Sequence, residues 1–581
     1  MLLKVLTAVF AGVLAWLAYF VNDLVSKRKR LAGLPQPPMT NLLLGHLEIA
    51  DECRRVFPKG IHSHAWADYI REKWKLPETF YVDWRPFGPL WLFTADPELS
   101  NEFFTIKQSL PKSSLMTGYL IQFLGKNNML SIEGAHHKSL RTMFNPGFSS
   151  NNIMTYADAI VEASLRFLDV LKEKAKTKEL FELEEYATRL TIDIIGLAVF
   201  DTNLQAQTKI HPIIRHFRER VLMMPGADTP FFFQDVQPTR GLRLWWNNRK
   251  LNAAVNDELN QKIQRRAKDL EDDARGIIKP KKKSIIDLAL NTYEKEMSMG
   301  ENVKSGDAIN RITDSSAVPP QLRQDLIDSI KTIFFAGHDT TSSTLAWCYY
   351  LLHRHPEAQA KLTAELDDSF PPGTSAAARI KEDPYIINKL EYTTACIRET
   401  LRIFPSASTI RQVYPSAAHN KVTDPRTGVE LDLEDAHIWP AVHLINRNKR
   451  IFPQPLKFIP ERFIQHLTPF PDADFFKPAG RNAFQPFGAG PRSCIGQELA
   501  MIESRIVLAL TAREVDFVLE FPGEEADPQP EIPENTVVEL GEKTGEGTPN
   551  VVEGHRVWQT LKGSAKPAGG CPGRVYLRTS A

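Results

Sequence analysis

A cysteine near the C-terminal end of the chain stands in a stretch rich in glycine. The segment FGAGPRSCIG, residues 487–496, sets Cys494 among three glycines and Arg492. A cysteine thiolate can ligate haem iron and push electron density toward cleavage of an O–O bond. Such a sulfur needs close backbone N–H groups, and glycine permits both that approach and the positive φ angles that aim amides inward. Arg492 has the reach to meet a haem propionate.

Two other roles compete for Cys494, those of a buried structural cysteine and of a reactive nucleophile. A nucleophilic thiol needs a histidine or lysine nearby to lower its pKa, and the local sequence offers only arginine. The glycine spacing fits neither alternative well.

A second candidate lies in the middle of a long apolar segment bounded by prolines. The pattern predicts one helix over residues 321–355, about 50 Å long at roughly 1.5 Å per residue, which must cross the core. Small and polar residues interrupt it, namely Ala336, Gly337, His338, Asp339, Thr340 and Thr341. Glycine weakens a helix and threonine can bend it, so we expect a groove in which an acid beside a hydroxyl relays protons. The alternative is close packing on a neighbour, although an unpartnered buried carboxylate would be costly.

Two further charged pairs are weak signals alone. Glu399 and Arg402 stand three residues apart, on one face of a helix that ends before a proline. Glu461 and Arg462 lie in a proline-rich loop. Acid–base pairs of this kind are common on solvated surfaces.

Composition excludes several classes of protein. The chain has 581 residues, 43% hydrophobic and 24% charged, with a formal net charge of +1. That balance is typical of a globular protein of two domains or one unusually large domain, and it lacks the basic excess of a nucleic-acid binder. The five cysteines are far apart, which argues against a zinc ribbon or a disulfide scaffold.

The N-terminus predicts a membrane anchor. Residues 5–21 are uncharged and mostly apolar, near the lower limit for spanning a bilayer of roughly 30 Å. The basic cluster KRKR follows at 27–30, an order that favours an uncleaved anchor in residues 1–26 with the body in the cytosol. Residues 27–40, basic and then proline-rich, are expected to form a stiff hinge.

The body, from about residue 50 to 520, has mostly helical periodicity, clearest at 182–200. Residues 79–95 read as a hairpin that turns near residues 87–89. Residues 522–554 carry nine acidic residues and five prolines against one lysine, and they are interpreted as a loop insertion. A mainly α protein with small β-sheets is therefore expected.

Four segments, in this order, resemble the haem-thiolate monooxygenases known as cytochromes P-450. The family patterns A/G-G-x-D/E-T-T, E-x-x-R, P-E-R-F and F-G-x-G-x-R-x-C-x-G are matched by residues 336–341, 399–402, 460–463 and 487–496. One match alone is fallible, but four in order behind an N-terminal anchor are highly specific. The resemblance covers about residues 40–520. Within the family, the chain is most similar in its sequence features to microsomal members from filamentous fungi.

The resemblance implies a cytochrome P-450 fold, with residues 41–581 as one large haem-binding domain behind the transmembrane anchor. Cys494 would be the axial ligand of the iron in haem b. Asp339 and Thr340 would deliver protons during O–O cleavage. The other expected contacts with the haem are His137, Arg141, Arg411, Phe487, Arg492 and Gly496.

The resemblance also assigns a structural role and shows a departure. Glu399, Arg402 and Arg462 would form a buried ion network that braces the haem-binding core. Where the family often has W-x-x-x-R, this chain has His137 with Arg141. A histidine can still donate to a propionate, so haem binding is still expected.

The implied activity is hydroxylation or epoxidation of an apolar small molecule with dioxygen. The chain has no nucleotide-binding glycine fingerprint, so electrons must come from a partner, an NADPH-cytochrome reductase with cytochrome b5 as a second donor. The resemblance suggests a fungal polyketide or terpenoid as substrate and the endoplasmic reticulum membrane as location. Alternatives are a fatty-acid or xenobiotic hydroxylase, a haem-thiolate isomerase or dehydratase, and a non-catalytic haem protein.

Two regions carry weaker expectations. Residues 209–250, rich in large apolar side chains, are as consistent with ordinary core helices as with a pocket roof or membrane-facing entrance. Paired histidines with nearby acids show no recognisable metal-ligand spacing and are interpreted as surface or loop residues: His62, His64, Asp68, Glu133, His136 and His137.

Overall fold

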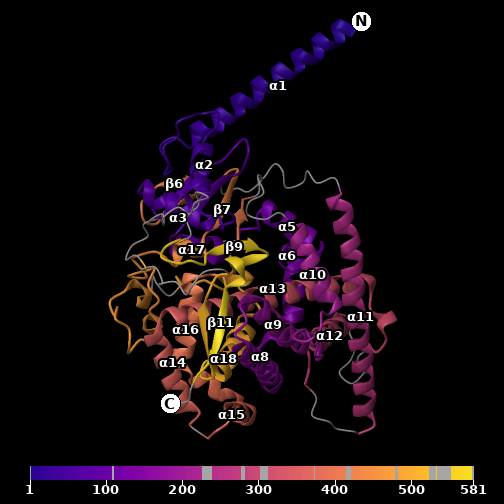
Figure 1. The fold of residues 1–581 in the computed structure, drawn as a ribbon. Coiled ribbons are helices and arrows are strands. Elements are labelled where there is room, and N and C mark those ends of the chain that lie inside the picture. Colours follow the sequence, from indigo (N-terminus) through magenta and orange to yellow (C-terminus); the bar gives the residue numbers. More distant parts are fainter. Residues whose placement is uncertain are drawn as a thin grey trace.

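Helices dominate a computed structural model of the chain, which describes residues 2–106, 110–224, 239–276, 282–300, 312–371, 373–413, 420–477, 482–522, 532 and 551–578. The helices are α1 Leu2–Arg30, α2 Leu47–Val56, α3 His64–Lys73, α4 Pro97–Asn101, α5 Ser114–Leu124, α6 Gly134–Phe144, α7 Ser150–Met154, α8 Ala157–Thr177, α9 Leu183–Phe200, α10 Pro212–Met223, α11 Arg240–Ala274, α12 Ile285–Gly300, α13 Pro320–Arg354, α14 Pro356–Ser369, α15 Ala376–Glu382, α16 Glu391–Ile403, α17 Val442–Ile445 and α18 Gln497–Thr511. The expected mainly α fold with small sheets is confirmed (Figure 1).

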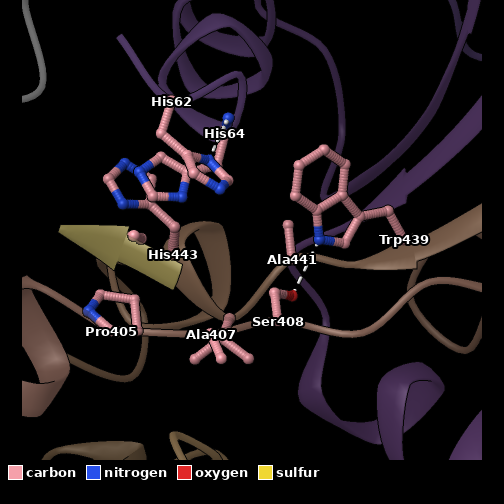
Figure 2. A pocket seen from close by; sticks show the side chains of 10 residues that line it. His62, His64, Pro405, Ala407, Ser408, Trp439, Ala441 and His443 are labelled. Carbon is pink, nitrogen blue, oxygen red and sulfur yellow. Dashed lines mark hydrogen bonds between the residues drawn. The ribbon is translucent and has the colours of Figure 1, made fainter. Parts of the chain in front are cut away.

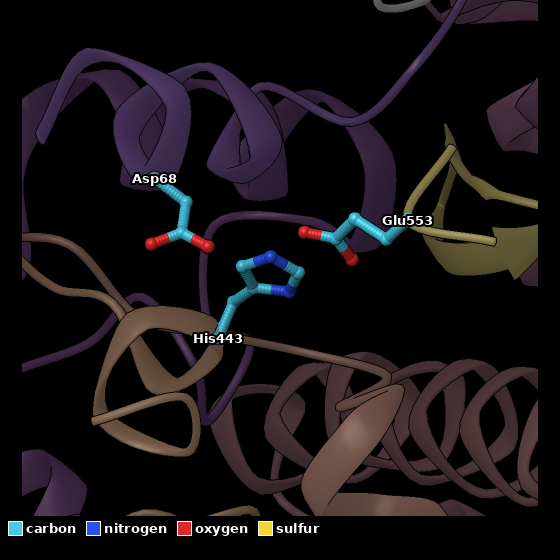
Figure 3. A group of neighbouring side chains, drawn as sticks. All are labelled: Asp68, His443 and Glu553. Carbon is cyan, nitrogen blue, oxygen red and sulfur yellow. The ribbon is translucent and has the colours of Figure 1, made fainter. Parts of the chain in front are cut away.

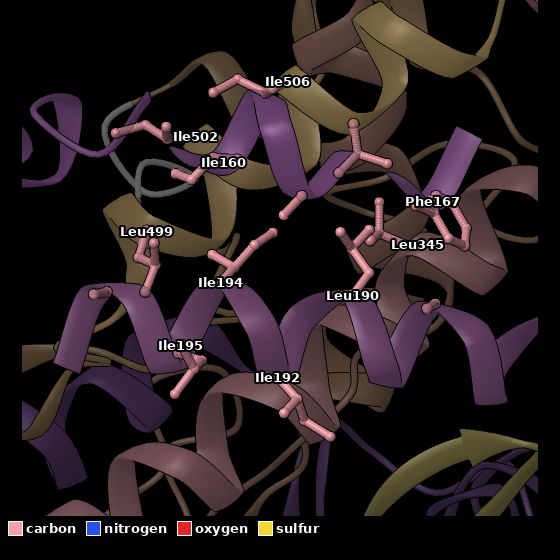
Figure 4. Packing of buried hydrophobic residues seen from close by; sticks show 14 of the residues in the cluster. Ile160, Phe167, Leu190, Ile192, Ile194, Ile195, Leu345, Leu499, Ile502 and Ile506 are labelled. Carbon is pink, nitrogen blue, oxygen red and sulfur yellow. The ribbon is translucent and has the colours of Figure 1, made fainter. Parts of the chain in front are cut away.

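The centre of the molecule is built around α13 and α9. Helix α13 is buried along most of its length and packs on α9, as expected for the long segment that crosses the core. From Leu190 to Phe200 helix α9 is buried on nearly all sides, whereas Glu184, Glu185 and Arg189 near its start are half-buried. Figure 4 shows Leu190 and Ile194 on one side of α9 and Ile192 and Ile195 on the other.

Small sheets lie around this helical core. The strands are β1 Thr79–Asp83, β2 Leu90–Thr94, β3 Phe181–Glu182, β4 Arg411–Gln412, β5 Lys421–Thr423, β6 Glu430–Asp432, β7 Ala436–Pro440, β8 Val515–Leu519, β9 Gln559–Lys562, β10 Ser564–Pro567 and β11 Pro572–Leu577. The expected hairpin is the antiparallel β1–β2 pair. On its other edge β2 pairs with β7 in parallel. The terminal strand β11 pairs with β8, so the chain after the acidic segment returns to the body.

Helix α1 projects from the body near α2, far from the C-terminus (Figure 1). Within the described residues it is the one helix long and apolar enough to cross a membrane. It does not end at the expected boundary of residue 26 but continues to Arg30, and its last turn is docked on the body. The basic cluster is therefore partly structural: Arg28 is buried against Asp83 rather than lying in a hinge.

Two segments named above lie partly or mostly outside the described residues. They are the acidic segment 522–554, apart from residues 522, 532 and 551–554, and residues 225–238 within the apolar region 209–250.

Candidate functional site

The loop that carries Cys494 requires glycine at two positions. Gly488 and Gly490 both have φ near +68°, a conformation that side chains rarely adopt. A Cβ on Gly490 would also lie 2.6 Å from the carbonyl oxygen of Phe104. The N–H of Cys494 donates to the carbonyl oxygen of Phe487 at 2.7 Å and closes the loop just before α18.

Cys494 differs from the other cysteines. It is exposed, whereas Cys53, Cys348, Cys396 and Cys571 are buried. Although the residue is exposed, protein atoms packed near the sulfur partly desolvate it and raise the pKa of the thiol. The N–H groups of Gly496 and Gln497 and the Arg141 guanidinium act in the opposite direction. An accessible sulfur held by inward-facing amides can bind a metal, and a bound iron would supply the charge that favours the thiolate.

A cluster of basic side chains, Lys112, His137, Arg141, Arg411 and Arg492, lies beside the Cys494 loop. Burial, together with Arg411 and Arg492, lowers the pKa of Lys112 to about 7. Burial and the same cations, with Arg141, lower the pKa of His137 to about 4. Burial and then Arg492 lower the pKa of Arg411 to about 10. The cluster therefore favours an anionic ligand, and the two propionates of a haem fit that requirement.

The structure shows how the expected haem contacts are held. Arg141 Nη1 donates to the carbonyl oxygen of Ser493 at 2.7 Å. Arg492 pairs with Glu133 and donates to the carbonyl oxygen of Ile132 at 2.6 Å.

Arg411 and Lys112 complete the basic cluster. Arg411 is 1% exposed and donates through Nη1 to the carbonyl oxygen of Leu110 at 2.8 Å. Its buried Nε has no hydrogen-bond partner among the described residues. Sequence reasoning missed Lys112, whose Nζ donates to Thr409 Oγ1 at 2.8 Å, because a lysine in a short loop carries no local signal.

Asp339 is buried and paired with a distant lysine. Its Oδ1 lies 2.8 Å from Lys566 Nζ on β10, and the same ammonium lies 2.6 Å from Glu184 Oε1. Burial opposes the charged ammonium, but Asp339 and Glu184 outweigh it and raise the pKa of Lys566 above its usual range. The second carboxylate oxygen of Asp339 is buried without a hydrogen-bond partner among the described residues and faces Gly563. No sequence pattern marks Lys566 for this role.

The small residues beside Asp339 serve packing as well. A Cβ on Gly337 would lie 2.3 Å from Cδ1 of Ile195, so α9 fills the space that the missing side chain leaves. At this position the close-packing alternative is correct and no groove is needed. Thr340 Oγ1 donates to the carbonyl oxygen of Ala336 at 2.7 Å, and Nδ1 of buried His338 hydrogen-bonds to the carbonyl oxygen of Phe334.

The expected ion network is present and fully buried. Arg402 Nε lies 2.7 Å from Glu399 Oε2, and Arg462 Nε lies 2.9 Å from Glu399 Oε1. Burial alone would raise the pKa of Glu399, but the two guanidiniums lower it overall. Arg402 also donates to the carbonyl oxygens of Asn446, Pro455 and Lys457, which ties α16 to the loop before the cysteine segment.

The paired histidines do not lie mainly on the surface, contrary to expectation. His64 and His137 are buried and His62 is half-buried, so of the four only His136 is exposed. His64 stacks on His443, with ring centroids 3.8 Å apart. Figure 2 shows the small pocket that these rings line, together with Pro405, Ser408 and Trp439. The pocket lies apart from Cys494 and Asp339, neither of which lines it.

A buried trio beside that pocket resembles a cation site (Figure 3), with the ligand atoms of Asp68, His443 and Glu553 within 4.8 Å of one another. Each carboxylate already faces a guanidinium: Glu553 lies 2.6 Å from Arg447, and Asp68 lies 3.5 Å from Arg71. Arg447 also contacts Nδ1 of His443, and arginine can only donate. The ring proton must then sit on Nε2, which faces the carboxylates, so the trio is a charge-balanced cluster and not a metal site.

Comparison with known proteins decides the family. The cytochrome P-450 family model matches residues 92–540. The chain is a cytochrome P-450. It is 32% identical to the cytochrome P-450 monooxygenase acrF of Aspergillus aculeatus, over 90% of this chain and 98% of that protein.

Two further relatives lie at greater distance. The cytochrome P-450 monooxygenase polC of Polytolypa hystricis is 28% identical over 95% of this chain and 91% of that protein. Human cytochrome P-450 4V2 is 29% identical over 70% and 71%. As a member of this family, the P-450 is an oxidoreductase of the monooxygenase class with a haem-thiolate cofactor.

Glu503 gives this P-450 a testable pH dependence. The residue is buried on α18, and burial raises its pKa to about 8 even though the Thr341 hydroxyl acts to lower it. The folded protein thus keeps a proton that the unfolded chain loses between about pH 4.5 and 8, so the contribution of Glu503 to stability falls as the pH rises through that window.

We expect Glu503→Gln to raise the melting temperature at pH 8 and to change it little at pH 5. Glu498→Gln, at an exposed glutamate on the same helix, should change neither value. Equal pH dependence in Glu503→Gln and wild type would contradict the assignment.

Proposed function

We propose that this P-450 inserts one atom of dioxygen into an apolar small molecule by hydroxylation or epoxidation, with Cys494 as the ligand of haem b. The observation that carries the proposal is an accessible cysteine, held by inward-facing amides, beside a cluster of buried cations. When bound, the haem supplies reductive activation of dioxygen.

The basic cluster would hold the haem carboxylates. Arg411 is buried and Lys112 partly buried, and Glu133 acts on both without outweighing burial and the neighbouring cations, so a propionate beside them would return the pKa of Lys112 toward its usual value. His137, Arg141 and Arg492 would complete the cradle, while Phe487 and Gly496 shape the loop around the sulfur.

The proton path would start at Asp339 and Thr340. Lys566 pairs with one carboxylate oxygen of Asp339 at 2.8 Å, and the second oxygen, which has no hydrogen-bond partner among the described residues, can accept and pass on a proton. The Thr340 hydroxyl donates to the Ala336 carbonyl at rest, and rotation about its χ1 bond would turn it to a reacting group.

The substrate class and the cellular setting complete the proposal. The relatives acrF and polC are fungal enzymes, and likeness to them over nearly the whole chain supports a fungal secondary metabolite, a polyketide or terpenoid, as substrate. Helix α1, the one apolar helix of membrane-spanning length among the described residues, supports a single-pass anchor in the endoplasmic reticulum. An NADPH-cytochrome reductase would then deliver electrons on the cytosolic side, with cytochrome b5 as a second donor.

Replacing Thr340 with alanine tests the proton path. We expect Thr340→Ala to keep the carbon-monoxide difference spectrum of the wild type, while product formed per NADPH falls about tenfold or more and hydrogen peroxide rises in its place. The measurement uses reductase, NADPH and an apolar substrate that the wild type oxidises. Thr344→Ala is the matched control, because Thr344 makes the same bond to the carbonyl one turn earlier, at 2.9 Å. Unchanged coupling in Thr340→Ala would rule out this role for the hydroxyl.

A further inference from the structure

Lys566 lies between two carboxylates that come from different helices. Its Nζ lies 2.8 Å from Asp339 Oδ1 on α13 and 2.6 Å from Glu184 Oε1 on α9. None of the three side chains, which we call the Lys566 cluster, is more than 13% exposed. Within the described part of the chain, no other cation pairs with either carboxylate. One ammonium therefore serves two negative charges.

The other titratable groups beside the Lys566 cluster carry no charge near neutral pH. Burial lowers the pKa of His338 on α13, so its imidazole is neutral. Burial and then a nearby carboxylate raise the pKa of Tyr119 on α5 to about 12, although Arg240 acts in the opposite direction. Burial and then Glu184 raise the pKa of the Cys571 thiol above its usual range. The cluster therefore keeps one negative charge in excess when both carboxylates are ionised.

The two carboxylates of the cluster are held unequally. Glu184 Oε1 also accepts from Thr188 Oγ1 at 2.9 Å and from Ser342 Oγ at 3.2 Å. Burial acts to raise the pKa of Glu184, but the ammonium and these hydroxyls outweigh it and lower the pKa overall. Asp339 has the ammonium on Oδ1 and no hydrogen-bond partner on Oδ2 among the described residues. Asp339 is thus the member that can leave the cluster at the smaller cost.

Release of Asp339 is feasible because Glu184 stays behind. A buried ammonium that lost its partner would be strongly unfavourable, since nothing would offset its desolvation. With Glu184 at 2.6 Å, Lys566 keeps a paired carboxylate while the Asp339 side chain rotates about its own bonds. A Cβ on Gly563 would lie only 3.0 Å from Asp339 Oδ2, so the glycine at the tip of the β9–β10 hairpin leaves that carboxylate its space.

We propose that Glu184 is a positioning residue for proton transfer, because it retains the Lys566 ammonium when Asp339 turns toward the reacting group. Asp339 then takes a proton from solvent and gives it up at the reacting group, so its carboxylate returns to its starting charge and to Lys566. The inference rests on the proposed proton path through Asp339 and adds the two residues that set how tightly this carboxylate is held.

Glu184→Gln tests this role. Glutamine keeps the size of the side chain but removes its charge, so Lys566 would hold Asp339 alone and the carboxylate would turn less readily. We expect an unchanged carbon-monoxide spectrum, product formed per NADPH about fivefold lower or less, and a larger solvent deuterium isotope effect on product formation. Glu185→Gln is the matched control, because this neighbouring glutamate pairs with two partly exposed arginines. Unchanged coupling and isotope effect in Glu184→Gln would overturn the inference.

Combining Glu184→Gln with Lys566→Met separates charge from structure. No ammonium then remains to hold Asp339, so we expect the double variant to couple at least about threefold better than Glu184→Gln alone. A merely structural role for Glu184 predicts instead that the two losses add. Coupling no better than in the single variant would therefore overturn the inference.

Infrared spectra of the resting holoenzyme give a readout that does not depend on turnover. Lys566→Met leaves two neighbouring carboxylates without a cation, so one of them should take up a proton at neutral pH. We expect an additional band of a protonated carboxyl group relative to the wild type. Lys562→Met, at an exposed lysine on β9, is the matched control and should add no band. Absence of the band in Lys566→Met would overturn the sharing of one ammonium by two charges.

Asp339→Asn separates the possible failures. If this variant is uncoupled while Glu184→Gln couples as the wild type does, the role of Glu184 is wrong and the proton path stands. If Asp339→Asn itself couples as the wild type does, the proposed path is wrong, and this inference with it.

Discussion

Replacing Cys494 with alanine is expected to abolish the thiolate haem spectrum and all oxygenation of substrate. The sulfur is the one accessible thiol among the described residues, and the Gly496 and Gln497 amides face it. Without it the basic cluster still attracts the carboxylates of a haem, so some haem should bind, but no residue would hold the iron. Carbon-monoxide difference spectra and NADPH-dependent product formation measure the two effects.

Cys348→Ala is the control for this change. That cysteine is buried on α13, 3.4 Å from Thr400 Oγ1, and has no access to a ligand. Its loss should cost some stability but leave the spectrum and activity of the folded protein unchanged. A Cys494→Ala protein that still oxygenates substrate would disprove the assignment of the ligand.

Replacing Glu399 with glutamine is expected to destabilise the protein by about 3–5 kcal/mol, because two buried guanidiniums lose their shared carboxylate. Haem content per chain should fall in parallel, since Arg402 ties α16 to the loop that precedes the cysteine segment. The low pKa of Glu399 sets the pH window. Its contribution is present above the ordinary glutamate pKa and is lost as the pH falls below it, so the difference between variant and wild type should shrink in acid.

Glu461→Gln is the matched control for Glu399. Glu461 pairs at 2.5 Å with Lys361, whose side chain is 57% exposed, and a pair of this kind contributes about 1 kcal/mol or less. Melting temperature and haem content report both variants. Equal and small effects in the two variants would contradict a bracing role for the buried network.

Local pattern predicted the elements of this fold well. The apolar period of residues 182–200 predicts α9, and the proline-bounded segment predicts α13 to within a residue. The turn between two β-rich runs predicts the β1–β2 hairpin. These features depend on neighbours in sequence, so periodicity and turn residues suffice to find them.

Local sequence patterns could not predict which charged residues lie close together in the fold. Lys566 meets Asp339 across more than two hundred residues, and Lys112 lies near Arg411 across almost three hundred. Nothing in the flanking residues marks either lysine, because its partner is chosen by how α13, β10 and the loop before α5 pack together.

The sequence alone determined the family, the cysteine loop and the apolar anchor, because each is encoded within a few consecutive residues. Tertiary structure decided that Gly337 serves packing against Ile195 and that Arg28 joins the anchor to the body. The physical reason is burial. A charged or small residue acquires its role only when other elements remove it from water, and then its partner must be close enough to offset the cost of desolvation.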